Sequence, residues 1–70
     1  MTTEEKIGLI ERVLGVEPGS LTEDTGLETV AEWDSLSILN LQVELTALMP
    51  DVQFDNLYNC MTVAEICQMI

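Results

Sequence analysis

Residues 33–45 read "WDSLSILNLQVEL", and they contain the clearest helical pattern in the chain. Apolar residues recur in it every three or four positions, a spacing typical of a helix. We predict a helix over residues 35–49 that ends before Pro50, because the residue that precedes a proline disfavours helical geometry. At about 100° per residue, the apolar side chains of this helix fall on two nearly opposite sides.

The two apolar sides differ in strength. The stronger side carries Ile38, Leu41, Leu45, Leu48 and Met49. The weaker side begins beside Ser35 and carries Leu36, Leu39, Val43 and Ala47. A helix with two such sides is either central in the fold or keeps one side for a partner. Because three main helices do not easily surround a fourth element, we expect the first side to face the core and the second side to bind partners.

Two further main helices are predicted on either side of this one. Thr2 and Glu5 have the spacing of a capping box ahead of a helix over residues 3–15, where Gly15 is a natural stop. Thr62 and Glu65 repeat that spacing ahead of a helix over residues 62–70. Residues 55–59 are expected to form one short helical turn. The sequence therefore predicts a single all-α domain over residues 1–70.

The connection over residues 16–33 is unusually long for a compact domain, and such loops are usually functional. It contains a Pro-Gly turn signal and many acidic residues. It also contains spaced apolar residues, which we expect to hold the loop against the core. These anchors are Val16, Leu21, Leu27, Val30 and Trp33.

The charge of the chain is strongly one-sided, with 13 acidic residues against Lys6 and Arg12, and no histidine, for a net charge of −11. Such a chain repels nucleic acids and anionic membranes, and it attracts basic partners. No apolar run is long enough to span a membrane. The N-terminus lacks the basic residues of a signal peptide, and Cys60 and Cys67 do not form a disulfide framework. We therefore expect a cytoplasmic monomer with reduced cysteines that pack in or beside the core.

Ser35 is the candidate functional residue, with three roles open to it. It can cap the helix, although Asp34 can do so equally well. It can act as a nucleophile, but a catalytic serine needs a general base and this chain has no histidine. It can carry a phosphate group added by another enzyme, because the free amides and the dipole of a helix N-terminus stabilise negative charge.

The stretch "WDSLSILNLQVEL" resembles the Asp-Ser-Leu attachment motif of acyl and peptidyl carrier proteins. The similarity extends over the whole chain and includes "LTEDTGL" before the motif and "MTVAEICQMI" at the end. It implies a four-helix bundle with three main helices, one short helix and a long first loop. It also implies that Ser35 carries 4'-phosphopantetheine, taken from coenzyme A by a separate transferase. Asp34 and Leu36 match the residues that flank the family's attachment serine.

The resemblance further implies a carrier that is not itself an enzyme. Its arm would hold acyl, aminoacyl or polyketide groups as thioesters. A loading ligase and downstream synthase or transferase enzymes would be its partners. The fatty-acid branch of the family usually differs at Glu32, Trp33 and Ser37, and it has more acids in the second helix, where this chain has Glu44. We therefore expect a specialised pathway and a partner face that is mainly apolar. This face comprises Leu36, Leu39, Asn40, Val43 and Ala47.

Two other functions fit parts of the sequence. The first is an unmodified acidic helical module that docks a basic partner through the second helix. The second is a calcium-binding protein, suggested by the many carboxylates. The chain lacks the Asp-x-Asp-x-Asp-Gly spacing of a calcium loop, so no metal site is expected.

Overall fold

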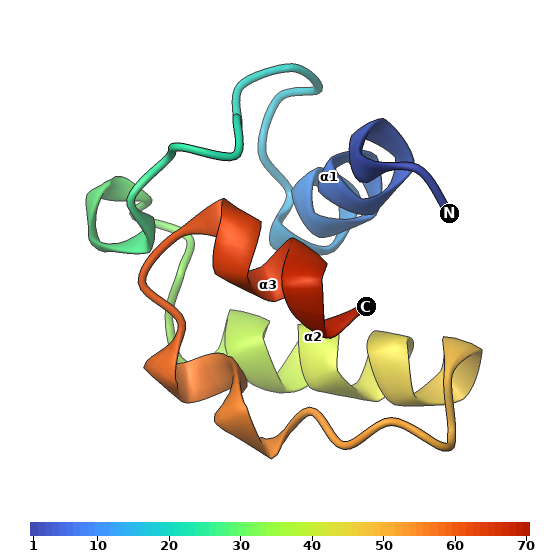
Figure 1. The fold of residues 1–70 in the computed structure, drawn as a ribbon. Helices are drawn as coiled ribbons and strands as arrows, with labels where there is room; N and C mark the ends of the chain where they lie inside the picture. The colour runs from blue at the N-terminus through green and yellow to red at the C-terminus, as the bar shows by residue number, and fades with distance from the viewer.

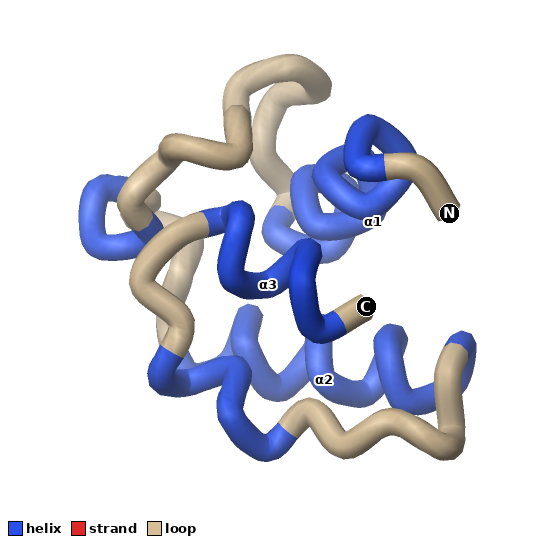
Figure 2. The backbone as a smooth tube through the Cα atoms, viewed as in Figure 1, coloured by secondary structure: helices blue, strands red, loops and turns tan.

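The computed structural model describes residues 1–70, and its regular structure is helical (Figure 2). The α-helices are α1 (Thr3–Leu14), α2 (Ser35–Leu48) and α3 (Val63–Met69), joined by the short 3-10 helices η1 (Leu27–Thr29) and η2 (Asp55–Asn59). No strand is formed, and the only bridge is an isolated antiparallel one between Gly26 and Thr62. The all-α prediction is confirmed. The short fourth helix is confirmed only in part, because residues 55–59 form a 3-10 helix.

Helix α1 begins and ends where its sequence signals predict. Thr2 and Glu5 form a complete capping box, in which each side chain accepts a hydrogen bond from the backbone amide of the other residue. Gly15 ends the helix in the left-handed conformation at φ 75°, and its amide is bonded to the last turn. A residue without a Cβ adopts this conformation at little cost.

The three α-helices enclose one apolar core. In Figure 1, α3 is seen between α1 and α2, and the connection after α2 runs back to η2. Helix α1 contacts both α2 and α3, and α2 also contacts η2. The core is a single cluster of 13 buried residues drawn from all three α-helices, the long loop and the η2 region. Its fully buried members include Ile10, Leu41, Leu45, Phe54 and Ile66.

Helix α2 turns one apolar side to this core, as predicted. Ile38, Leu41 and Leu45 are buried, and Met49 is half-buried at the end of the helix. The prediction was wrong for Leu48, which is 52% exposed. Leu48 lies in the last turn and borders an open hollow between α2 and α1, so it is only partly covered and its helical phase alone did not determine its burial.

The long first loop is pinned to the beginning of α3. Backbone carbonyls of Glu23 and Thr25 accept hydrogen bonds from the amides of Ala64 and Val63, at 3.0 and 3.1 Å. These are two of the first-turn amides that a helix leaves unpaired. Leu21 and Leu27 are buried, while Val16, Val30 and Trp33 are half-buried against the core. The predicted anchoring of the loop is thereby confirmed.

The second predicted capping box is only half formed. Thr62 accepts a hydrogen bond from the amide of Glu65 and caps α3, which therefore begins at Val63. The Glu65 carboxylate accepts instead from the amide of Met61. The Met61 carbonyl, in turn, accepts a bond from the amide of Leu27. The Glu65 carboxylate therefore bonds to the amide of Met61 and not to that of Thr62, which the capping-box spacing implied.

Both cysteines are free, and burial raises the pKa of each thiol. Cys67 is buried in α3, whereas Cys60 is half-buried at the end of η2. The expectation of packing in or beside the core is confirmed. None of the helices combines the length and the apolar character that crossing a membrane requires.

Candidate functional site

Ser35 is the first residue of α2, and its side chain is exposed. The residue before it, Asp34, has extended backbone geometry and is the N-cap. The Asp34 carboxylate accepts a hydrogen bond of 2.9 Å from the amide of Ser37. The structure thus decides between the two possible caps. Because Asp34 fills the capping position, the hydroxyl of Ser35 is left without a hydrogen-bond partner in the chain.

The Asp34 carboxylate beside Ser35 is stabilised in its ionised form. The hydrogen bond from the backbone of Ser37 is the main reason why the pKa of Asp34 is lowered. The positive end of the α2 dipole lies at the same place and also favours negative charge. The surroundings of Ser35 therefore combine the positive end of a helix dipole with a neighbouring carboxylate.

The segment ahead of Ser35 is fixed by a series of turns. The amide of Val30 donates to Leu27, that of Trp33 to Val30, and that of Asp34 to Glu32, each at 3.0 Å. Val30 and Trp33 pack against the core from this segment. The predicted role of Trp33 as an anchor of the loop is confirmed. These contacts place Ser35 at the junction of a rigid turn and the first turn of α2.

The second apolar side of α2 begins at this junction and faces solvent. Leu36 is 68% exposed, Leu39 48% and Val43 61%, and Asn40 and Ala47 are exposed as well. Glu44 is the only charged residue in the helix. This side is largely open to solvent, with α1 beside only part of it, which agrees with the predicted division of α2 into a core side and a free side. We call it the α2 face, comprising Leu36, Leu39, Asn40, Val43 and Ala47.

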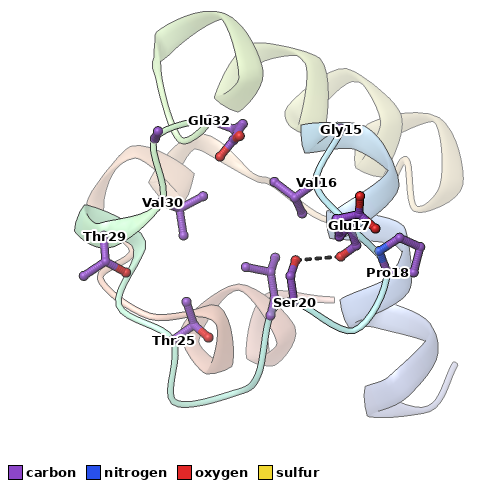
Figure 3. Close-up of a pocket in the computed structure, with 11 residues that line it drawn as sticks. Gly15, Val16, Glu17, Pro18, Ser20, Thr25, Thr29, Val30 and Glu32 are labelled. Atoms are coloured by element: carbon purple, nitrogen blue, oxygen red, sulfur yellow. Dashed lines mark hydrogen bonds between the residues drawn. The ribbon is translucent and has the colours of Figure 1, made fainter.

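A broad open hollow lies between the end of α1 and the loop that precedes α2 (Figure 3). Its volume is about 660 Å³, and it is lined by 11 residues between Gly15 and Glu32. Figure 3 shows Val16 and Val30 facing each other across it, with Glu32 extending toward it. We call this feature the loop hollow. The sequence did not reveal it, because its walls come from segments that meet only in the folded chain.

Glu11 is a structural residue that the sequence reading missed. Its side chain is 5% exposed, and one carboxylate oxygen accepts hydrogen bonds from the amides of Gly19 and Leu21, at 2.8 and 3.0 Å. It thereby ties the first turn of the loop to α1 and supports a wall of the loop hollow. The signal was present in its position: Glu11 follows Ile7 by four residues and precedes Leu14 by three, on the apolar side of α1.

Residues 7–70 match the sequence profile of a family described as PP-binding, the phosphopantetheine attachment site. The chain belongs to this family. The cofactor of the family is 4'-phosphopantetheine, which is attached covalently to the domain. Comparisons with individual curated proteins and with solved structures gave no significant match.

An exposed hydroxyl at the start of a helix fits this cofactor. The group is joined to its carrier through a phosphate, and the amides and dipole of a helix N-terminus stabilise a phosphate. When bound, the cofactor supplies a thiol at the end of a long arm, on which acyl groups are carried as thioesters. The membership of the family confirms the resemblance that the Asp-Ser-Leu stretch indicated. It supports a phosphopantetheine-carrying protein, and the helical fold agrees with it.

Proposed function

We propose that this protein is an acyl carrier, and that Ser35 is the residue that receives 4'-phosphopantetheine. Ser35 is exposed, begins α2, and keeps its hydroxyl free because Asp34 caps the helix. This single observation carries the assignment, within a chain that belongs to a phosphopantetheine-attachment family. Residues 1–70 would act as one carrier domain, as a monomer in the cytoplasm.

The modification itself requires a separate transferase. The Ser35 oxygen attacks the phosphorus that bears the pantetheine in coenzyme A and forms a new phosphate ester. The pyrophosphate bond breaks, and adenosine 3',5'-bisphosphate leaves with the bonding electrons. The serine proton passes to a base on the transferase, because this chain has no histidine. In this proposal Asp34 and Leu36 are recognition residues on either side of the reacting hydroxyl.

The α2 face is proposed as the docking surface for the transferase, a loading ligase and downstream enzymes. Its exposed apolar residues begin next to Ser35 and continue along the helix. Charge contributes less here than in an acid-rich helix, because Glu44 is the only charged residue in α2. Partners are therefore expected to present apolar residues at the centre of the contact and basic residues around it, where the net charge of −11 acts. We propose a specialised pathway on the same grounds.

The attachment site is tested by mass spectrometry. The protein is incubated with coenzyme A and a broad-specificity phosphopantetheinyl transferase, beside the variants Ser35→Ala and Ser37→Ala. We expect one phosphopantetheine on the wild type and on Ser37→Ala, and none on Ser35→Ala. Ser37 is a matched control because it lies in the same helical turn. An unmodified wild type would instead favour an acidic interaction module that docks partners through α2.

The docking surface is tested by the rate of the same reaction. Leu39→Ser changes the α2 face, and Leu48→Ser changes a residue of similar exposure outside that face. We expect Leu39→Ser to slow modification about tenfold and Leu48→Ser to leave the rate nearly unchanged. Equal rates for the two variants would exclude Leu39 from the contact. Circular dichroism checks that both variants keep the helical content of the wild type.

A further inference from the structure

The loop hollow lies immediately before the proposed attachment residue. Val30, Ala31 and Glu32 line it, and Glu32 precedes Ser35 by three positions. We propose that the loop hollow is a cargo site, and that it receives a short acyl group that ends in an ammonium, such as an aminoacyl group. This inference rests on the proposed attachment at Ser35, from which the flexible arm would fold back to bring the cargo to this wall.

The floor of the loop hollow suits only a short aliphatic segment. Val16, Leu21 and Val30 supply apolar surface, and Figure 3 shows the two valines facing each other. The hollow is open to solvent, so a long alkyl chain would leave most of its surface in water. A few methylene groups can lie against the valines while a polar end remains among the hydrophilic residues of the rim.

The lining holds three hydroxyl groups, and two of them have already committed their protons within the chain. The Ser20 hydroxyl donates to the Glu17 carbonyl at 2.6 Å, and the Thr29 hydroxyl donates to the Gly26 carbonyl at 2.6 Å. Each hydroxyl has one proton, so its oxygen can now only accept further bonds. These two lining groups therefore favour a ligand that donates hydrogen bonds.

Two carboxylates in the same lining add to this preference. Glu17 and Glu32 are both exposed lining residues, and no lysine or arginine lines the hollow. An ammonium group has three donors and no acceptor, so it complements carboxylate oxygens and hydroxyl oxygens together. A carboxylate at the end of the cargo would be repelled by the same groups. The lining thus distinguishes cargoes of similar length by the charge at their free end.

Tethering makes such a shallow site effective. A group held on a flexible arm at Ser35 has an effective local concentration in the millimolar range, so weak contacts are enough to populate the docked state. Exposed charge pairs contribute little each. We therefore expect an ammonium to raise the docked population only about two- to fivefold over a neutral end group.

Three cargoes separate the chemical possibilities. The apo protein is loaded by the transferase from β-alanyl-, butyryl- or malonyl-coenzyme A, whose acyl groups have similar length and end in a cation, a methyl and an anion. Amide chemical shifts are compared with those of the form that carries the free thiol. We expect the β-alanyl form to shift Val16, Val30, Ala31 and Glu32 about two- to fivefold more than the butyryl form. The malonyl form should leave these amides unshifted.

Charge-removing variants then locate the effect. Glu32→Gln and the double variant with Glu17→Gln should reduce the β-alanyl shifts to the level of the butyryl form. Glu28→Gln removes the same charge from an exposed residue outside the lining, and it should preserve the shifts. The spectrum of each free-thiol form verifies that the variant is folded.

Other outcomes overturn the inference. Equal shifts for all three cargoes, shifts located only among residues of α2 and α3, or β-alanyl shifts that persist in the double variant would each contradict it. Failure of the wild type to gain mass in the loading reaction has a different meaning. That result would refute the proposed attachment, and the cargo site with it, before any shift was measured.

Discussion

The carboxylate of Asp34 accepts a hydrogen bond from the amide of Ser37, at 2.9 Å, and so closes the first turn of α2 around Ser35. Ser35 occupies the first helical position without taking part in the cap. Two adjacent residues thereby have separate tasks. Asp34 stabilises the start of the helix, and Ser35 presents an unused hydroxyl to solvent.

This division predicts opposite results for two alanine variants. Ser35→Ala removes no hydrogen bond within the chain, so the free energy of unfolding should stay within about 0.5 kcal/mol of the wild type. Asp34→Ala removes the cap and should lower stability measurably. Urea titrations followed by circular dichroism provide the comparison. A larger loss in Ser35→Ala than in Asp34→Ala would contradict the assignment of the cap.

The contribution of Asp34 should depend on pH. Its folded-state pKa is lowered, chiefly by the hydrogen bond from the Ser37 backbone, so its carboxylate stabilises the folded protein when ionised. That stabilisation is complete above the unfolded-state pKa of about 4, and it is lost as the pH falls through the lower folded-state value. The gap between wild type and Asp34→Ala should therefore be widest near neutrality and shrink toward acid. Urea titrations at several pH values measure this difference in the free energy of unfolding. A difference that widened in acid would contradict the predicted pH dependence.

Glu11 should be important for the stability of the first loop. Glu11→Ala leaves the amides of Gly19 and Leu21 without their acceptor, and the bond to Leu21 is buried. We expect a loss of about 2 kcal/mol in the free energy of unfolding. Glu11→Gln keeps an oxygen acceptor and should lose less. Hydrogen exchange at Leu21 is the direct local measurement, since it should accelerate in Glu11→Ala; unchanged exchange there would disprove the tether.

The two sides of α2 should differ in their sensitivity to truncation. Leu41 is fully buried, whereas Leu39 is 48% exposed in the same helix. Leu41→Ala should cost about 2–4 kcal/mol through lost packing and the cavity that remains. Leu39→Ala should cost less than about 1 kcal/mol. Thermal and urea unfolding of the pair test this, and similar losses would mean that the α2 face is covered in solution.

Added salt should raise the melting temperature. With a net charge of −11, the folded chain is destabilised by repulsion among its acids, and mobile ions screen that repulsion. Differential scanning calorimetry in increasing sodium chloride measures the effect. Sodium perchlorate at equal ionic strength is the control, because a rise in both salts identifies screening rather than exclusion of a particular anion. A melting temperature independent of salt would argue against self-repulsion.

Features that depend on neighbouring residues could be predicted from the sequence alone. The capping box of Thr2 and Glu5 and the stop at Gly15 are made by residues within a turn of each other, so their spacing sufficed to place α1. The apolar period of α2 likewise identified Ile38, Leu41 and Leu45 as its buried side. The Asp-Ser-Leu stretch led to the family, whose profile matches residues 7–70.

Features that join segments distant in the chain could be learned only from the folded structure. Even the local choice between Asp34 and Ser35 as the cap of α2 needed the backbone geometry, which assigned the cap to Asp34. Leu48 has the phase of a core residue, yet it is 52% exposed because it lies at the edge of the contact with α1, beside an open hollow. Glu11 is buried because the amides of a loop 8 and 10 residues away satisfy its carboxylate. Burial and hydrogen bonding depend on which surfaces meet, and local spacing does not contain that information.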